Sequence, residues 1–124
     1  MYKKTGFAHF KAAFTYSMAG LKAALRYESA FRQEAAIFLL ALPAIWWLAT
    51  SLLDAVALLA VLLLVLIVEL LNSAIEAVVD RVGYDPHELS GRAKDLGSAA
   101  VMLSLMLAGL VWSAYLWQKL SSGF

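Results

Sequence analysis

Apolar residues in this sequence gather in three long runs that are separated by short polar stretches. The runs cover about residues 35–53, 55–79 and 97–120. Each is close to the roughly 20 apolar residues that an α-helix needs to cross a hydrocarbon layer of about 30 Å. Pro43 interrupts the first run, but membrane helices tolerate the loss of one backbone donor. The pattern therefore predicts three transmembrane helices.

Residues 5–27 follow a different pattern, in which apolar residues recur every three or four positions and basic residues lie between them. The apolar positions are Phe7, Phe10, Phe14, Met18, Leu21 and Leu25, and the basic positions are Lys11, Lys22 and Arg26. A basic amphipathic helix with aromatic residues is typical of a segment that lies in the plane of a membrane surface. A helix packed on a soluble core is the alternative, but the rest of the chain offers little such core. We therefore expect an N-terminal surface helix.

The composition supports a membrane protein and excludes several kinds of chemistry. Of the 124 residues, 63% are hydrophobic, whereas soluble domains contain about 45–50% apolar residues. A chain this short cannot bury so much apolar surface in a soluble fold. The absence of cysteine excludes disulfides and cysteine metal sites, and the formal charge of +1 gives no indication of a nucleic-acid partner. No cleavable signal peptide is evident, and we expect one all-α membrane domain over residues 1–124.

Basic residues in the polar stretches predict how the chain is oriented in the membrane. Lys and Arg are frequent before residue 35, absent from residues 50–54, and present again in residues 80–96. Cytoplasmic connections carry an excess of Lys and Arg. We therefore expect a multi-pass protein whose N-terminus and residues 80–96 lie in the cytoplasm.

The second apolar run carries a stripe of polar residues. At about 100° per residue, one helix face collects Glu69, Asn72, Ser73, Glu76 and Asp80. Glu69 lies roughly 16 Å along the helix from Asp80, which places it well inside the apolar layer. A carboxylate there costs on the order of 2.5–3.5 kcal/mol, so intramembrane acids normally face the protein interior and mark ion, proton or reaction sites. The alternative for Asn72 and Ser73 is a structural hydrogen bond between helices.

Acids at different depths are suited to different chemistry. An acid near the cytoplasmic surface can hold Mg²⁺, which prefers oxygen ligands. A deeper and drier acid is suited to proton abstraction. Glu28 and Glu34 lie between the surface helix and the first apolar run. Either could turn toward the stripe, although a solvated position at the interface is the favoured alternative.

Residues 80–96 add charged groups beside the membrane. Arg92 and Lys94 could bind phosphate oxygens, or they could be ordinary basic residues of a cytoplasmic connection. Asp95 directly precedes the third apolar run, where a functional role and an N-cap of the third helix carry equal weight. The sequence contains neither a P-loop nor the glycine-rich loop of protein kinases. Any nucleotide is therefore bound in another way.

Four segments of the sequence together resemble a known family. They are "TGF" near the start, "AFRQE" before the first run, "VELLNSAIEAVVDR" and "HELSGRAKDLGSAAV". They strongly resemble the small integral-membrane diacylglycerol kinases of Gram-negative bacteria, and the similarity extends from Thr5 to Trp117. The undecaprenol kinases of Gram-positive bacteria share the architecture and are the alternative. The resemblance implies a homotrimer in the bacterial inner membrane that transfers a phosphoryl group from ATP, with Mg²⁺, to diacylglycerol.

The resemblance also implies roles for individual residues. Glu69 matches the catalytic base, Asn72 matches a second active-site residue, and Glu28 and Glu76 match metal-binding acids. The implied nucleotide contacts are His9, Tyr16, Glu28, Glu76, Asp85, Pro86, His87, Lys94 and Asp95. The implied lipid-substrate contacts are Ala13, Met18, Lys22, Leu25, Ala30, Phe31, Arg32, Gln33, Glu34, Trp47, Glu69, Ser98, Trp112 and Trp117.

The sequence departs from the family pattern at two places. The family usually has an arginine where this chain has His9, and Lys11 is another source of that positive charge. Pro86, in "YDP", removes a backbone donor from the nucleotide-side connection. Two other classes of protein remain as alternatives: a small proton-coupled transporter, which would also use an intramembrane acid, and a non-catalytic subunit whose acids pair with a partner's basic residues.

Overall fold

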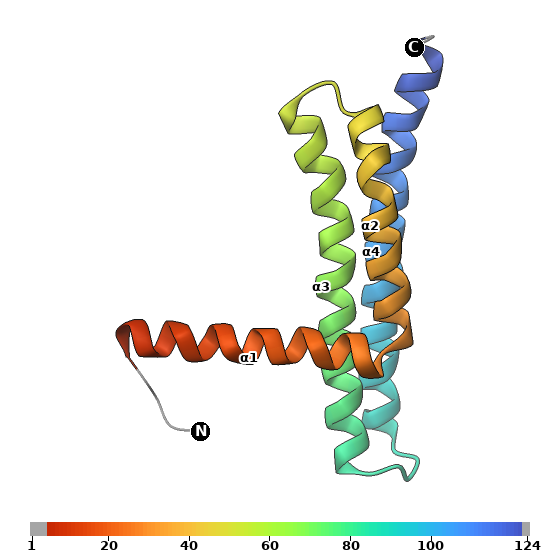
Figure 1. The fold of residues 1–124 in the computed structure, drawn as a ribbon. Helices are drawn as coiled ribbons and strands as arrows, with labels where there is room; N and C mark the ends of the chain where they lie inside the picture. Colours follow the sequence, from red (N-terminus) through yellow and green to blue (C-terminus); the bar gives the residue numbers. More distant parts are fainter. Residues whose placement is uncertain (1–4, 123–124) are drawn as a thin grey trace.

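The computed structural model describes residues 5–122, so the two ends of the expected domain 1–124 lie outside the described part. Residues 5–122 form four helices and no strand: α1 (Gly6–Tyr27), α2 (Ser29–Leu48), α3 (Leu52–Val82) and α4 (Glu88–Ser121). Helices α2, α3 and α4 run lengthwise beside one another, and α1 runs across them (Figure 1). The all-α class predicted from the sequence is confirmed.

Three of the described helices are long and apolar enough to cross a membrane. They are α2, α3 and α4, with mean hydropathies of 1.2, 2.8 and 1.9 over their most apolar windows. Only 11–17% of the residues in those windows are buried within the chain. The apolar side chains therefore point mostly outward, toward lipid or toward other chains, as the three apolar runs predicted.

Helix α1 presents its apolar side chains to the surroundings. Phe7 and Phe14, on the face that the periodicity marked as apolar, are 80% and 62% exposed. A helix packed on a soluble core would hide these rings, so the alternative of a core-packed helix is not supported. An exposed aromatic face on a basic helix fits a position on the membrane surface.

The predicted ends of the first membrane helix were wrong. The sequence placed this helix at residues 35–53, whereas α2 begins at Ser29 and ends at Leu48. Residues 49–51 leave the helix because Ser51 starts the next one, where its side-chain oxygen accepts a hydrogen bond of 3.1 Å from the backbone N–H of Asp54. Serine at the N-cap with an acid three residues later is a common start signal for helices.

The connection between α3 and α4 is shorter than predicted. Helix α3 continues to Val82, and α4 begins at Glu88 rather than near residue 97. His87 caps α4, because its Nδ1 accepts a hydrogen bond of 3.0 Å from the N–H of Leu89. Asp95 lies inside α4, so the N-cap alternative for this residue is wrong. Apolar runs mark only the lipid-facing part of each helix, and both helices continue into polar sequence.

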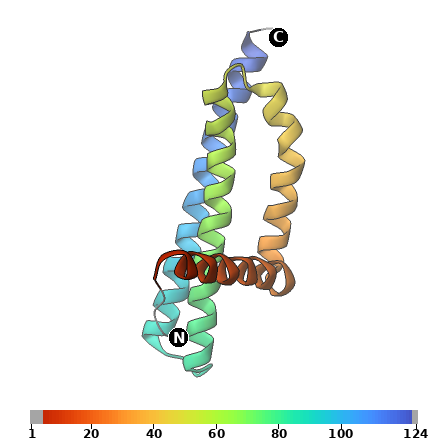
Figure 2. The ribbon, with the colours of Figure 1, turned by 60° about the vertical axis from the view of Figure 1, so that its left-hand side comes forward.

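Helices α3 and α4 pack along most of their length, and they lie side by side in both ribbon views (Figures 1 and 2). The buried positions of α4 are Gly97, Ser104 and Ala108. Small residues let two membrane helices approach closely. This close contact carries the polar stripe of α3 inward, where Glu69 is buried.

Polar contacts stabilise the end of the bundle that lies away from α1, where residues 49–51 connect α2 to α3 (Figure 1). We call this the distal end. Tyr115 Oη donates to Asp54 Oδ1 at 3.0 Å, and Thr50 donates to Asp54 Oδ2 from its hydroxyl at 2.8 Å and from its N–H at 3.1 Å. The indole N–H of Trp112 donates to the carbonyl of Leu58 at 3.2 Å. Beside these contacts, Ile45, Leu48 and Leu58 form an apolar cluster. Sequence reasoning did not identify this polar cluster.

We expect Tyr115→Phe to lower the free energy of unfolding, because it removes a hydrogen bond to a charged group that joins α3 to α4. Detergent-induced unfolding in mixed micelles measures this change. Tyr84→Phe is the matched control, since Tyr84 is 85% exposed. Equal stability of the two variants would contradict a stabilising role for the Tyr115–Asp54 contact.

Candidate functional site

Four acidic side chains from three elements gather where α1 meets the bundle. Glu28 lies between α1 and α2, Glu34 lies on α2, and Glu69 and Glu76 lie on α3. Glu69 is only 6% exposed, and its carboxyl group is within electrostatic range of Glu76, Glu28 and Glu34. Like charges with little water around them repel strongly. The cluster therefore favours protons or cations that reduce its negative charge.

Two oxygen atoms near this cluster are buried and lack a hydrogen-bond partner within residues 5–122. They are Glu34 Oε1 and Asn72 Oδ1. Buried polar atoms are normally paired, and unpaired ones often mark functional positions. Across the described residues no group of three or more His, Cys, Asp or Glu side chains forms a closed metal site. A metal at this cluster would therefore rely on one or two carboxylates together with ligands from water or substrate, as Mg²⁺ commonly does.

A single extended residue joins α1 to α2 and places Glu28. Glu28 has φ −113° and ψ 105°, its N–H donates to the carbonyl of Ala24 at 3.0 Å, and its carbonyl accepts from the N–H of Arg32 at 3.1 Å. Arg32 also closes the end of α1, because its Nη1 donates to the carbonyls of Leu25 and Arg26, both at 3.0 Å. Cationic side chains favour helix C-termini. This role of Arg32 was not predicted from the sequence. A basic residue a few positions after the end of a helix is the signal that could have indicated it.

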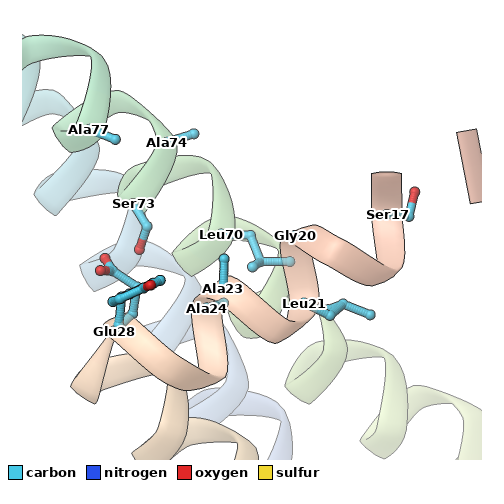
Figure 3. Close-up of a pocket in the computed structure, with 11 residues that line it drawn as sticks. Ser17, Gly20, Leu21, Ala23, Ala24, Glu28, Leu70, Ser73, Ala74 and Ala77 are labelled. Carbon is cyan, nitrogen blue, oxygen red and sulfur yellow. The ribbon is translucent and has the colours of Figure 1, made fainter. Parts of the chain in front are cut away.

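An open groove of about 670 Å³ lies between α1 and α3. Small and apolar residues of both helices line it, and Ser17, Tyr27, Glu28 and Ser73 add polar groups (Figure 3). The contribution of α3 begins at Leu70 and ends at Ala77. Glu69 directly precedes this stretch, so it lies near the level of the surface helix. Helix α3 continues well past α1 (Figure 1), and the depth of Glu69 within the membrane stays a prediction.

A second pocket, of about 290 Å³, lies at the connection between α3 and α4. Its lining includes Asp85, Pro86, His87 and Lys94, which the resemblance assigned together to nucleotide. Lys94 Nζ lies 2.8 Å from Asp80 Oδ1, which brings the last acid of the polar stripe to this pocket. Asp95 follows Lys94 on α4 and is exposed. Arg92 pairs with Glu88 at 3.1 Å on the exposed surface of the same helix.

Trp47 and Trp112, which the resemblance also assigned, lie away from the acidic cluster within this chain. Trp112 bonds to Leu58, which lies eleven residues before Glu69 on α3, a separation of roughly 16 Å along a helix. The ring of Trp47 lies 5.6 Å from Lys119 Nζ near the end of α4. Phe31 is buried, with 4% exposure. The remaining assigned positions are exposed: His9, Ala13, Tyr16, Met18, Lys22, Leu25, Ala30, Gln33, Ser98 and Trp117.

Comparison with known proteins identifies the family to which this chain belongs. The sequence model described as "Prokaryotic diacylglycerol kinase" matches residues 15–116. The diacylglycerol kinase of Escherichia coli strain K12 is 51% identical over 113 residues, which cover 91% of this chain and 93% of that protein. That of Haemophilus influenzae is 45% identical over 116 residues, covering 94% and 98%. That of Pseudomonas aeruginosa is 45% identical over 113 residues, covering 91% and 92%. The chain belongs to the prokaryotic diacylglycerol kinase family, which confirms the resemblance found in its motifs.

We expect Arg32→Met to loosen the last turn of α1, because the carbonyls of Leu25 and Arg26 lose a charged donor. Backbone amide exchange in residues 24–28 should become about 10- to 100-fold faster, which corresponds to a lost bond of about 1.5–3 kcal/mol. Hydrogen–deuterium exchange with mass spectrometry measures this rate. Arg26→Met is the control, since Arg26 faces the ring of Tyr27 at 5.3 Å. If both variants exchange at the same rate, Arg32 does not close α1.

Proposed function

We propose that this protein is a diacylglycerol kinase that uses MgATP and releases phosphatidic acid and ADP. It works as a homotrimer at the cytoplasmic face of a bacterial inner membrane, with its N-terminus in the cytoplasm. Membership of the prokaryotic diacylglycerol kinase family supports the reaction. The single observation that carries the site is buried Glu69, held within range of three other acids beside the surface helix.

In this proposal the lipid reaches the acids from the groove between α1 and α3, and the nucleotide reaches them from the connection between α3 and α4. An alcohol is a weak nucleophile at neutral pH, so its proton must be removed as it attacks phosphorus. Glu69 is the base, because it is the most buried acid of the cluster and lies next to the groove between α1 and α3. The groove accepts the apolar part of the lipid, whose hydroxyl stays near the membrane surface. The lipid therefore does not have to leave the membrane for the reaction.

Glu28 and Glu76 would hold Mg²⁺. Both interact electrostatically with Glu69, and Mg²⁺ is usually bound by one or two carboxylates together with substrate phosphates and water. The metal supplies positive charge to the transferring phosphoryl group. Asn72 stands one helical turn from both Glu69 and Glu76 and helps to orient the reacting groups. Phosphoryl transfer depends chiefly on such positioning and charge neutralisation.

The nucleotide lies on the water side of the acids. The pocket at the connection between α3 and α4 holds Asp85, Pro86, His87 and Lys94, and the cation of Lys94 is suited to phosphate oxygens. Asp95 and, from α1, Tyr16 complete the set. His9 or Lys11 supplies the remaining contact on α1. In a homotrimer these groups meet across subunits, which accounts for the exposure of Tyr16 and His9 in one chain.

Transfer of label from γ-phosphate-labelled ATP into extracted lipid tests the function. We expect the purified protein, in micelles with diacylglycerol, to label phosphatidic acid, and Glu69→Gln to lower the turnover number about 10²- to 10⁴-fold, the usual contribution of a general base. The fold should persist, because glutamine keeps the size of the side chain and carries no charge. Glu88→Gln is the control, since Glu88 is an exposed acid at the start of α4.

Three results would count against this assignment. Wild-type activity in Glu69→Gln would remove Glu69 as the base. Labelling of undecaprenol in preference to diacylglycerol, in direct competition, would identify the sister activity. Proton transport without lipid labelling would favour a transporter.

We expect Glu76→Ala to require much more Mg²⁺ for half-maximal activity, because one of two metal-binding carboxylates is lost. Titration of activity with Mg²⁺ at saturating ATP measures the change. Glu88→Ala is the control, since Glu88 is an exposed acid that pairs with Arg92 at the start of α4. If Glu76→Ala shows the Mg²⁺ dependence of the wild type, Glu76 does not hold the metal.

A further inference from the structure

A glycine of α4 lies directly against the asparagine of the polar stripe. Gly97 is one of the buried residues of α4. A Cβ atom at this position would collide with Asn72 Oδ1 and would lie 3.2 Å from Asn72 Cγ. The side chain of Asn72 therefore occupies the space that any other residue at position 97 would fill.

A glycine at position 97 lowers the stability of α4, and the contact with Asn72 gives a reason for its presence that Gly109, another glycine inside the helix, lacks. Glycine weakens the interior of a helix compared with alanine, because it loses more backbone freedom on folding. Gly109 is also inside α4, and a Cβ there would meet nothing within 4 Å. The close contact with Asn72 is thus particular to Gly97.

The contact also accounts for the orientation of Asn72. Its Oδ1 is buried and has no hydrogen-bond partner among residues 5–122. An amide that is free to rotate would turn this oxygen toward a donor or toward solvent, since burial without a partner is unfavourable. The backbone of α4 at Gly97 limits where the carboxamide can go, and it holds the group at the contact between α3 and α4.

We propose that Gly97 is a positioning residue, which acts on the reaction by leaving room for the carboxamide of Asn72 at the contact between α3 and α4. The role in catalysis depends on the proposed kinase function, whereas the contact itself does not. A methyl group at position 97 pushes the carboxamide out of its place without touching any substrate. A 1 Å displacement of a positioned group can lower a rate about 10²-fold.

The contact can be observed directly, because Asn72 is the only asparagine in the sequence. Labelling with asparagine that carries ¹⁵N in its carboxamide gives one side-chain NH₂ signal in the full-length protein in micelles. We expect Gly97→Ala to shift this signal and Gly109→Ala to leave it in place. An unchanged signal in Gly97→Ala would overturn the proposal.

Kinetics test the consequence for the reaction. In Gly97→Ala we expect the turnover number per folded protein to fall about 10²-fold, while KM for ATP and for diacylglycerol stays within about twofold. Gly109→Ala should retain both parameters. A normal turnover number in Gly97→Ala, together with a shifted Asn72 signal, would overturn the positioning role. If the wild type itself does not phosphorylate diacylglycerol, the proposed function fails, but the signal of Asn72 still tests the contact.

A double variant keeps the proposal testable if Gly97→Ala folds poorly. Asn72→Ala removes Oδ1 and Cγ, the two atoms that a methyl group at position 97 would crowd, and leaves only Cβ at 3.8 Å. We therefore expect Gly97→Ala to lower the unfolding midpoint in the wild-type background and not in the Asn72→Ala background. An equal loss in both backgrounds would show that the methyl group collides with something other than Asn72, and the proposal would be wrong.

Discussion

Repulsion among carboxylates is the constraint on which the rest of this structure depends. Glu28, Glu34 and Glu76 lie within electrostatic range of Glu69, which is almost removed from solvent. Such a group of acids is stable only when protons or cations offset part of the charge. A reaction that needs a general base and a divalent cation offsets the charge in both ways, because the base takes up a proton and another acid binds the cation. The cluster therefore fits phosphoryl transfer to an alcohol better than it fits a purely structural role.

Local contacts at the helix ends hold these acids together against their repulsion. Arg32 closes α1 and fixes the residue from which Glu28 projects. At the distal end, Asp54 joins the start of α3 to Tyr115 of α4. Between these two points, small residues of α4 let α3 approach closely. With these contacts in place the stripe on α3 faces inward, where Glu69 is buried.

The sequence was sufficient for features that depend on helical periodicity and not for those that depend on distant partners. Glu69, Asn72 and Glu76 share a face in any α-helix, so the stripe could be predicted before the fold was known. The early start of α4 could not be predicted in this way. Hydropathy marks only the apolar part of the helix, whereas the N-cap His87 sets where the helix begins. The bond from Tyr115 to Asp54 joins residues 61 positions apart, and no local pattern marks it.

The single residue Glu28 connects the surface helix to the acidic cluster that we propose as the reaction centre. Helix α1 lies across the bundle with its aromatic rings exposed, and Glu28 follows its last residue directly (Figure 1). A change in the tilt of α1 would therefore move the carboxylate of Glu28 relative to Glu69. Because the exposed aromatic rings of α1 fit a membrane surface, a change in lipid packing would reach the acidic cluster through this connection.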